Sequence, residues 1–291
     1  MTMPTTSGFK TRIVSLKQEY DKLKVDKAAL LKLIDEAEIP ESVYNSSAIE
    51  NSTLTLKETE KILLEMEVSR DVSVREVFEA KNLARVMEYI RAKSSEELTE
   101  NMIVLLHQML MGNIDDSIAG RFRKQNEYVR VGTHIAPAAE HIERMIEEIL
   151  ISYSSDHITY FLDKIAKFHL DFETIHPFND GNGRIGRVLI NYQLYYLGFP
   201  GIIIRDKEKK TYYRAFNEYR DDKQTKIIER LIALAIMESL HKRITYLKGS
   251  TIVELTAYAS KIDKQTSAVL NAAKRQTIPA FREKGVWKIG A

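Results

Sequence analysis

The sequence lacks cysteine altogether, and its 291 residues include only 12 glycines, 6 prolines and one tryptophan. Without cysteine there are no disulfides, no thiolate metal site and no cysteine nucleophile. The low glycine and proline content excludes collagen-like and low-complexity chains. The absence of cysteine fits a reducing compartment but does not demand one.

Long apolar runs and an excess of charge of one sign are also absent. No stretch of about 18 apolar residues occurs, so we expect no membrane-spanning segment and no membrane partner. Residues 1–10 lack the apolar stretch of a secretory signal. Lys and Arg number 43 against 41 Asp and Glu, and the net charge of +2 does not indicate a polyanion binder. We therefore expect a cytoplasmic protein.

What the sequence does contain is enough apolar residues to bury a core, at 44% of the chain. At about 150 residues per domain, the length predicts roughly two domains. Apolar residues recur at helical spacing through most of the chain, which predicts a mainly helical fold. After a loose tail over residues 1–10, a helical run around 28–37 is expected to stop before Pro40, and a separate short segment follows over 42–51.

Three local patterns refine this expectation. Thr55–Glu58 and Ser73–Glu76 both have the spacing of a capping box at a helix start. Tyr128–Val131 alternates like a strand, and it lies between a polar turn at 124–127 and Gly132. We therefore predict a β-hairpin over 121–135.

The most informative stretch is Ile175-His-Pro-Phe-Asn-Asp-Gly-Asn-Gly-Arg-Ile-Gly-Arg187. Pro177 disfavours the α conformation at His176, so a helix should end with this imidazole at its C-terminus. Gly181 and Gly183 permit a tight loop whose backbone N–H groups converge on an anion. Helical spacing resumes from Gly183, and a glycine-rich loop entering a helix N-terminus is a phosphate site.

Charged side chains complete the same loop. Arg184 and Arg187 are three residues apart and therefore neighbours on the first turns of the helix. Asp180 has no Arg at the spacing of a simple structural partner, so a divalent cation between this carboxylate and a phosphate would explain it. A base, a carboxylate, a phosphate cradle and two guanidiniums together suit nucleotidyl or phosphoryl transfer. Each residue alone is commonly a cap, core or turn residue, but their combination within a dozen positions favours a site.

His-Pro-Phe-Asn-Asp-Gly-Asn-Gly-Arg-Ile-Gly-Arg resembles, residue for residue, the signature of the Fic family. The resemblance covers roughly residues 97–246. It implies a helical bundle with a β-hairpin flap, and an enzyme that moves AMP from ATP to a Ser, Thr or Tyr hydroxyl of a target protein. Gly183 stands where phosphotransferring Doc-type relatives have Lys, which favours nucleotidyl transfer.

The resemblance also implies a role for each residue of the motif. His176 would be the base that takes the proton of the attacking hydroxyl, and Asp180 would hold Mg²⁺ against the phosphates. Arg184 would bind the β-phosphate and Arg187 the γ-phosphate. The remaining phosphate contacts would come from Gly181, Asn182 and Gly183.

Two weaker segments resemble family features. The end of the hairpin corresponds to the flap that aligns a target segment as an added strand; its residues are Val131, Gly132, Thr133 and His134. Tyr212 and Tyr213 fall where relatives pack aromatic rings near adenine, although plain packing is the more common role of such a pair on a helix.

Ser46-Ser-Ala-Ile-Glu50-Asn51 matches the inhibitory helix motif of family members that carry their own restraint, here over about residues 42–52. Ser46 and Glu50 share one face of a helix. A Glu50 carboxylate near Arg187 would occupy the place of the γ-phosphate charge, so that ATP binds unproductively. A solvated glutamate in an ordinary helix is the simpler alternative.

The C-terminal stretch from Ser250 is basic, with seven Lys or Arg and three Asp or Glu. Two short helices followed by a hairpin around Lys284 resemble a winged helix-turn-helix. The sequence therefore predicts three parts: an N-terminal helical region (1–96), a catalytic core (97–247) and a winged-helix-like module (248–291). DNA is a candidate partner of this module, beside target docking and internal packing.

The partners expected from the resemblance are ATP and a target protein, with the chain itself or a second copy in a homodimer as candidates. Three other interpretations stay open. The protein is a DNA-binding regulator with a nucleotide-sensing or inactive core, or it removes AMP from a modified protein. The weakest interpretation is a metal-dependent hydrolase using His169, Asp171 and His176, whose spacing matches no known ligand set.

Overall fold

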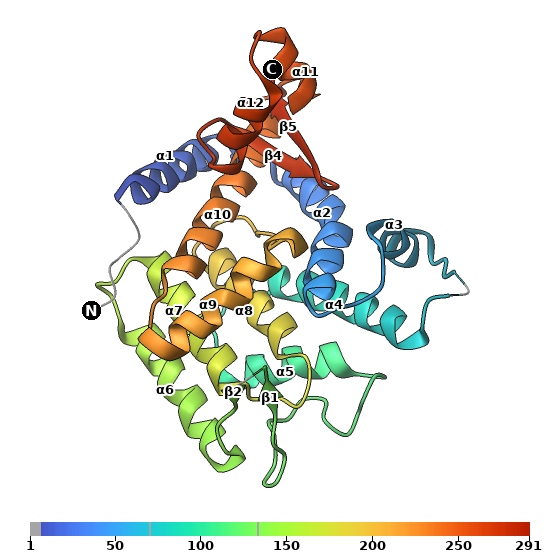
Figure 1. The fold of residues 1–291 in the computed structure, drawn as a ribbon, viewed down its shortest axis with the longest axis vertical. Helices are drawn as coiled ribbons and strands as arrows, with labels where there is room; N and C mark the ends of the chain where they lie inside the picture. The colour runs from blue at the N-terminus through green and yellow to red at the C-terminus, as the bar shows by residue number, and fades with distance from the viewer. Residues whose placement is uncertain (1–6, 70, 133) are drawn as a thin grey trace. The chain divides into compact units, whose positions relative to one another are not determined.

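The computed structural model describes residues 7–69, 71–132 and 134–291, which are mainly helical, as predicted (Figure 1). The chain divides into two compact units. The first holds Ile39–Gly198 and Ile203–Glu229; the second holds residues 7–38, Phe199–Ile202 and Arg230–Ala291. The N-terminal segment and the C-terminal segment from Arg230 thus belong to the same unit. The division into three parts at residues 96 and 247 stays a prediction.

The helical elements of the first unit, besides the end of α2 (Ala28–Ile49) and the start of α10 (Lys226–Leu247), are α3 (Leu56–Glu60), a π-helical turn (Lys61–Glu65), α4 (Val74–Ala92), α5 (Glu100–Met111), a 3₁₀ turn (Ala139–His141), α6 (Ile142–Ser155), α7 (Phe161–Ile175), α8 (Asn182–Tyr196), a second 3₁₀ turn (Asp206–Glu208) and α9 (Lys209–Asp222). The core of this unit forms where α4, α5, α7 and α8 pack against one another. Leu83, Ile103, Phe172 and Ile185 are fully buried there.

Helix α2 runs without a break from Ala28 to Ile49 and contains Pro40. The prediction that the helix stops before Pro40 is therefore wrong. Proline removes one backbone hydrogen bond inside a helix, but Val43 and Ile49, beyond it, are both fully buried. Burial of the helix after Pro40 outweighs the lost bond, which a rule based on local sequence does not include.

The predicted hairpin is present but short. Its strands are β1 (Arg130–Val131) and β2 (His134–Ile135), paired antiparallel with Val131 opposite His134. The polar turn before it forms at Lys124–Glu127, where the Glu127 N–H donates to the Lys124 carbonyl. Residues 121–129 contain no strand, so the hairpin is confirmed only at its tip, and Thr133 lies outside the described residues.

Both predicted caps are present, in different forms. Thr55 and Glu58 form a complete capping box at the start of α3. At the start of α4, the Ser73 hydroxyl accepts the Glu76 N–H at 3.2 Å. The Glu76 carboxylate accepts hydrogen bonds from the Ser73 hydroxyl, Ser52 and Thr53. The box is incomplete because it requires a bond from the Ser73 backbone N–H to this carboxylate.

The second unit contains a small module with its own core. Its three-stranded antiparallel sheet has the order β3-β5-β4, and two short helices lie between the first strand and the others in sequence. The helix α1 begins at Ser7, so the predicted tail is wrong for residues 7–10. The elements are α1 (Ser7–Leu23), most of α10 (Lys226–Leu247), β3 (Ile252–Glu254), α11 (Leu255–Lys261), α12 (Thr266–Lys274), β4 (Ala280–Glu283) and β5 (Val286–Gly290).

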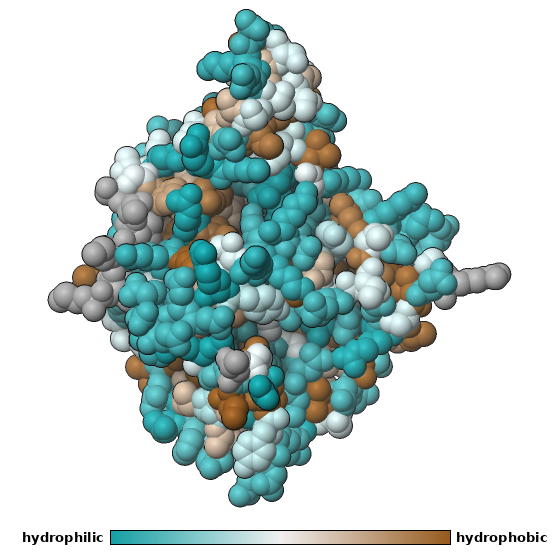
Figure 2. Space-filling model, in the orientation of Figure 1, coloured by the Kyte–Doolittle hydropathy of each residue, from teal (hydrophilic) through white to brown (hydrophobic). Residues whose placement is uncertain are grey.

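The surface is mainly hydrophilic on the face that Figure 2 shows, with hydrophobic residues in separate patches. In the first unit, Leu64, Met66 and Val74 are more than two-thirds exposed near α3 and the start of α4. Within the described residues, the helices include none that is both long and apolar enough to cross a membrane.

Candidate functional site

The site is built on the loop that joins α7 to α8. Helix α7 ends at Ile175, and the N–H of His176 donates to the Phe172 carbonyl at 2.9 Å. His176 has a left-handed backbone with φ of 51°, because the following Pro177 disfavours the helical conformation. The imidazole thus stands at the C-terminus of α7, as predicted.

Asn182 and Gly181 give the loop its shape. The Asn182 amide accepts the Phe178 N–H at 2.9 Å and donates to the Phe178 carbonyl at 2.8 Å. Gly181 has φ of 82°, and a Cβ there would meet the Leu110 side chain at 3.1 Å. The Asn182 side chain is therefore committed to the loop itself, and its contribution to a phosphate cradle is the loop shape that it imposes.

His107 supports the loop from α5, a role that the sequence analysis missed. Its buried ring stacks on Phe178 at 3.7 Å. Nδ1 accepts the Gly120 N–H at 3.1 Å, so Nε2 carries the proton and donates to the Asp180 carbonyl at 3.0 Å. Burial lowers the pKa of His107 to about 4, which keeps the ring neutral. Its only signal in the sequence is a polar residue within an apolar helix.

Arg123 and His134 attach the hairpin to the same loop. The buried Arg123 donates to the carbonyls of His176, Glu127 and Pro137 at 2.8–2.9 Å. His134, which pairs with Val131 across the hairpin, donates from Nε2 to the Thr174 carbonyl at 2.9 Å. One of the flap residues suggested by the sequence, His134, is thereby tied to the last turn of α7, Val131 pairs with it across the hairpin, and Gly132 has φ of 61° in the turn.

His176 has an environment that suits a base. Burial lowers its pKa to about 4, so the imidazole is neutral at neutral pH and able to accept a proton. The Glu173 carboxylate lies 4.0 Å from Nδ1. Burial, reinforced by Glu50, raises the pKa of Glu173 to about 8.

Arg187 is held by the end of α2. Its Nε donates to the Ser46 hydroxyl at 3.0 Å, Nη2 donates to the Ser46 carbonyl at 2.7 Å, and Nη1 lies 2.9 Å from the Glu50 carboxylate. A Cβ on Gly183 would stand 2.2 Å from Glu50 Oε1. The Glu50 carboxylate therefore lies directly over the first turn of α8, beside the guanidinium that the sequence analysis expected it to meet.

Several contacts hold Glu50 in this position. Lys209 donates to the Ala48 carbonyl at 3.2 Å and to Asn51 Oδ1 at 2.8 Å. Tyr213 donates to the Ile49 carbonyl at 3.1 Å. Asn51 has a left-handed backbone with φ of 68° as α2 ends. Asn adopts this conformation more readily than most residues other than Gly, which suits Asn51 to the position directly after the helix.

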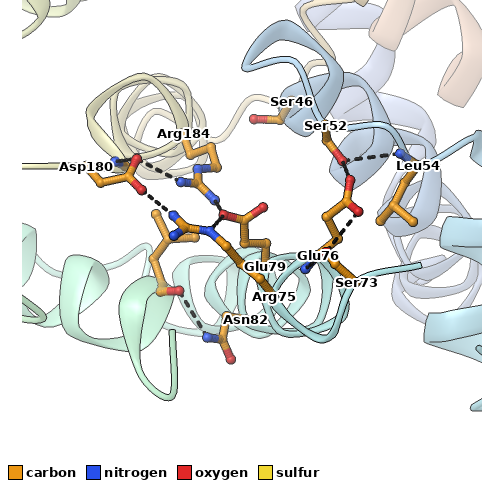
Figure 3. Close-up of polar contacts among 12 residues, drawn as sticks. Ser46, Ser52, Leu54, Ser73, Arg75, Glu76, Glu79, Asn82, Asp180 and Arg184 are labelled. Carbon is orange, nitrogen blue, oxygen red and sulfur yellow. Dashed lines mark hydrogen bonds and ion pairs between the residues drawn. The ribbon is translucent and has the colours of Figure 1, made fainter. Parts of the chain in front are cut away.

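Asp180 and Arg184 form the other end of the site, together with two residues of α4 (Figure 3). Asp180 lies 2.7 Å from Arg75 and 3.2 Å from Arg184, and Arg184 also lies 3.2 Å from Glu79. The prediction that Asp180 lacks a structural Arg partner is wrong, because Arg184 is one helical turn away. Burial alone would raise the pKa of Asp180, but Arg184, the Gly181 N–H and Arg75 hold it below its usual value.

A magnesium ion fits Asp180 by its chemistry. Across the described ranges, no three His, Cys, Asp or Glu side chains gather as a metal cage. Mg²⁺ commonly uses one or two carboxylates together with substrate phosphates and water, rather than a complete protein cage. The Asp180 carboxylate is 41% exposed, and it can therefore be reached from solvent.

Tyr212 does not offer a face to a nucleotide base. Its ring is 1% exposed, and its hydroxyl lies 2.8 Å from His169 Nε2 and accepts from Arg187 at 3.4 Å. Tyr213 is partly buried and holds α2. The partners of Asp171 are Lys167 and Tyr219, so His169 and Asp171 are occupied separately and support no shared metal site.

Known proteins are similar to this chain in sequence and in fold. The model of the Fic/DOC family matches residues 97–194. The chain is 32% identical over 182 residues to protein adenylyltransferase Fic of Nematostella vectensis, covering 60% of this chain and 42% of the relative. It is 27% identical over 248 residues to protein adenylyltransferase fic-1 of Caenorhabditis elegans, covering 83% and 45%. This chain thus spans less than half the length of these curated relatives.

Solved structures share the fold. A Fic-domain-containing signalling protein from Bacteroides thetaiotaomicron superposes with a TM-score of 0.72 at 23% identity, over 82% of this chain and 98% of that one. Fic-1 from C. elegans superposes with a TM-score of 0.69 at 25% identity, over 83% and 73%. The mainly helical architecture is therefore that of known Fic-domain structures.

Proposed function

Residues 97–194 form a Fic domain, and on this premise we propose that the protein is an autoinhibited protein adenylyltransferase. It would transfer AMP from ATP to a Ser, Thr or Tyr hydroxyl of a target protein and release pyrophosphate. The relatives named protein adenylyltransferase support this activity.

His176 is the base of the proposed reaction. The hydroxyl oxygen of the target attacks the α-phosphorus of ATP, and the bond from this phosphorus to the bridging oxygen of pyrophosphate breaks. The His176 ring accepts the hydroxyl proton, and its lowered pKa keeps the ring unprotonated at neutral pH before the reaction. The hairpin, anchored by Arg123, would present the target segment beside this base.

The triphosphate would lie at the N-terminus of α8. Backbone N–H groups and the helix dipole favour an anion there, and Arg184 and Arg187 add two guanidiniums. Asp180 would hold Mg²⁺, which neutralises phosphate charge when it is bound. Gly181 and Gly183 let the phosphates approach the backbone, and Asn182 maintains the loop.

The contact between Glu50 and Arg187 is the main observation that supports autoinhibition. A carboxylate that neutralises Arg187 takes the place of a phosphate charge. The nucleotide must then displace Glu50, or bind without its terminal phosphate on Arg187. Transfer would remain slow until Glu50 leaves.

Intact mass spectrometry tests the proposal without a known target. Wild type, Glu50→Gly and the double variant Glu50→Gly, His176→Ala are each incubated with ATP and Mg²⁺, with self-modification as the reaction. We expect one added AMP in the single variant only. An adduct of equal extent in the double variant would remove His176 as the base, and no adduct with a confirmed substrate would remove the transferase activity. Release of AMP from a modified protein would instead establish reverse chemistry.

A second candidate function belongs to the C-terminal module, for which we propose duplex DNA as a partner. Lys274 and Arg275 are exposed at the end of α12, and Lys284 is exposed in the turn between β4 and β5. A helix and a strand turn that both carry basic residues suit the major groove and the phosphate backbone. Fluorescence anisotropy of the full chain with duplex DNA tests this at several salt concentrations. Binding that weakens with salt and with Lys274→Ala, Arg275→Ala supports it, and its absence removes it.

A further inference from the structure

Two residues of α4 complete the charged end of the site, and the sequence motif contains neither. Arg75 lies one residue into α4, and Glu79 follows one turn later. Arg75 donates from Nε to Glu79 at 3.1 Å and from Nη2 to Asp180 at 2.7 Å. Glu79 also pairs with Arg184, which in turn pairs with Asp180. The four charges alternate around a closed ring, as Figure 3 shows.

The ring divides into a buried pair and an exposed pair. The Arg184 and Glu79 side chains are 5% and 15% exposed, whereas those of Arg75 and Asp180 are 56% and 41% exposed. The contact between Arg75 and Asp180 is therefore the one that solvent can screen and a ligand can reach.

Asp180 is the residue that would bind the metal ion, yet both of its oxygens already face a cation. Arg75 occupies Oδ2, and Arg184 together with the Gly181 N–H occupies Oδ1. A metal ion bound at Oδ2 must displace Arg75, because two cations cannot share one carboxylate oxygen without repulsion. Arg75 has room to move, since it lies on the exposed first turn of its helix.

We propose that Arg75 is a counter-ion of Asp180 that competes with the metal ion for this carboxylate, and that Glu79 sets the strength of this competition by holding Arg75 and Arg184. The inference rests on the proposed function in one respect, that Asp180 is a metal ligand. It adds two positioning residues from α4 that set how tightly the site binds a divalent cation.

Binding of Mn²⁺ to the full chain with ADP tests the proposal, measured by the electron paramagnetic resonance signal of free Mn²⁺ and not by activity. Arg75→Ala removes the competitor, so Mn²⁺ should bind about fivefold more tightly, as expected for loss of one partly exposed ion pair. Arg75→Lys should change the affinity less. Arg144→Ala is a matched control, because Arg144 is an exposed arginine paired with Glu148 one turn later on α6.

Glu79→Gln gives a result of opposite sign. Without the Glu79 carboxylate, the positive charges of Arg75 and Arg184 are less neutralised and both attract Asp180 more strongly. Mn²⁺ should therefore bind a few-fold more weakly. Equal melting temperatures for Arg75→Ala, Arg144→Ala and wild type would show that the folded state is intact.

The outcomes separate this inference from the proposed function. Unchanged or weaker Mn²⁺ binding in Arg75→Ala overturns the competition, even if Asp180→Asn abolishes binding and so confirms the metal ligand. Unchanged binding in Glu79→Gln overturns the part assigned to Glu79. Unchanged binding in Asp180→Asn removes the metal ligand itself, and the inference falls with it, whereas AMP transfer in the mass assay is judged independently.

Discussion

Arg184 and Arg187 lie one turn apart on α8 and are equally buried, but their partners differ. Arg187 is bound by Ser46, near the end of α2, and by Glu50, directly after this helix. Arg184 is bound by Glu79 from α4 and by Asp180 from its own loop. A single carboxylate, 35% exposed, thus neutralises Arg187, whereas Arg184 is one member of a ring of four charges and faces two carboxylates. Movement of the Glu50 side chain alone therefore frees Arg187 for a phosphate group. Arg184 becomes available only when a ligand replaces its ion pairs with Glu79 and Asp180.

The largest expected effect comes from removing Arg187 in the activated protein. In a Glu50→Gly background, Arg187→Ala should lower the rate of AMP transfer at least about a hundredfold, because a lost charge contact in the transition state has this size. Arg187→Ala alone should not raise the rate above wild type, although it also removes the anchor of Glu50. Quantitative intact mass against time measures both rates. A rate in Arg187→Ala equal to that of Glu50→Gly would show that Arg187 serves only the restraint.

Removing Glu50 should give the next largest effect, in the opposite direction. Glu50→Gly should raise the initial rate of self-modification about tenfold or more, equivalent to at least about 1.4 kcal/mol of restraint. Glu50→Gln keeps the size and removes the charge, so it should also activate the protein if charge is the basis of the restraint. Activation by Gly alone would assign the restraint to the bulk of the side chain instead.

The pH dependence tests whether Glu50 also acts on the base. Burial holds the pKa of His176 at about 4 and Glu50 raises it, so removal of Glu50 should not shift it upward. The transfer rate of Glu50→Gly should therefore stay nearly constant from about pH 5.5 to 7.5 and fall about tenfold per unit once the imidazole is protonated. Initial rates across this range measure it. A midpoint near 6.5 would contradict the buried environment of His176.

The smallest expected effect concerns stability near Arg187. The pKa of Glu173 is about 8 in the folded protein and lies near 4.5 in an unfolded chain. The contribution of the protonated Glu173 carboxyl to the free energy of unfolding is therefore fully present below about pH 4.5, and it is lost as the pH rises through about 8. Glu173→Gln cannot deprotonate, so its melting temperature should exceed that of wild type by about 3 °C at pH 9 and match it near pH 5. An equal difference at both pH values would assign the effect to packing.

The local sequence was sufficient to predict the backbone of this site, but not the contacts that distant segments make with it. Pro177 and the glycines specify the end of α7 and the start of α8 through backbone conformation alone, which depends only on neighbouring residues. The contact between Asp180 and Arg75 joins positions 105 residues apart. Nothing in the spacing of either residue indicates the other, because the packing of α4 against α8 brings them together.

Pro40 and Tyr212 also show that packing against distant residues, which the local sequence does not reveal, decides the structure. A proline is a reliable local signal to end a helix, but buried residues farther along α2 outweigh it. Tyr212 and Tyr213 look alike in sequence, yet one ring is buried against His169 and the other reaches the end of α2. Which face of α9 is covered depends on its neighbours, and the sequence of α9 alone does not contain that information.

The missing side chain at Gly183 couples position 183 to position 50. The space that a Cβ would need there is already taken by Glu50. A sequence with any larger residue at 183, including lysine, cannot keep a glutamate at position 50 in this pose. A side chain at position 183 is therefore compatible with Glu50 only if the carboxylate moves away from its place beside Arg187. The bare backbone at position 183 is thus a steric requirement of the restrained state.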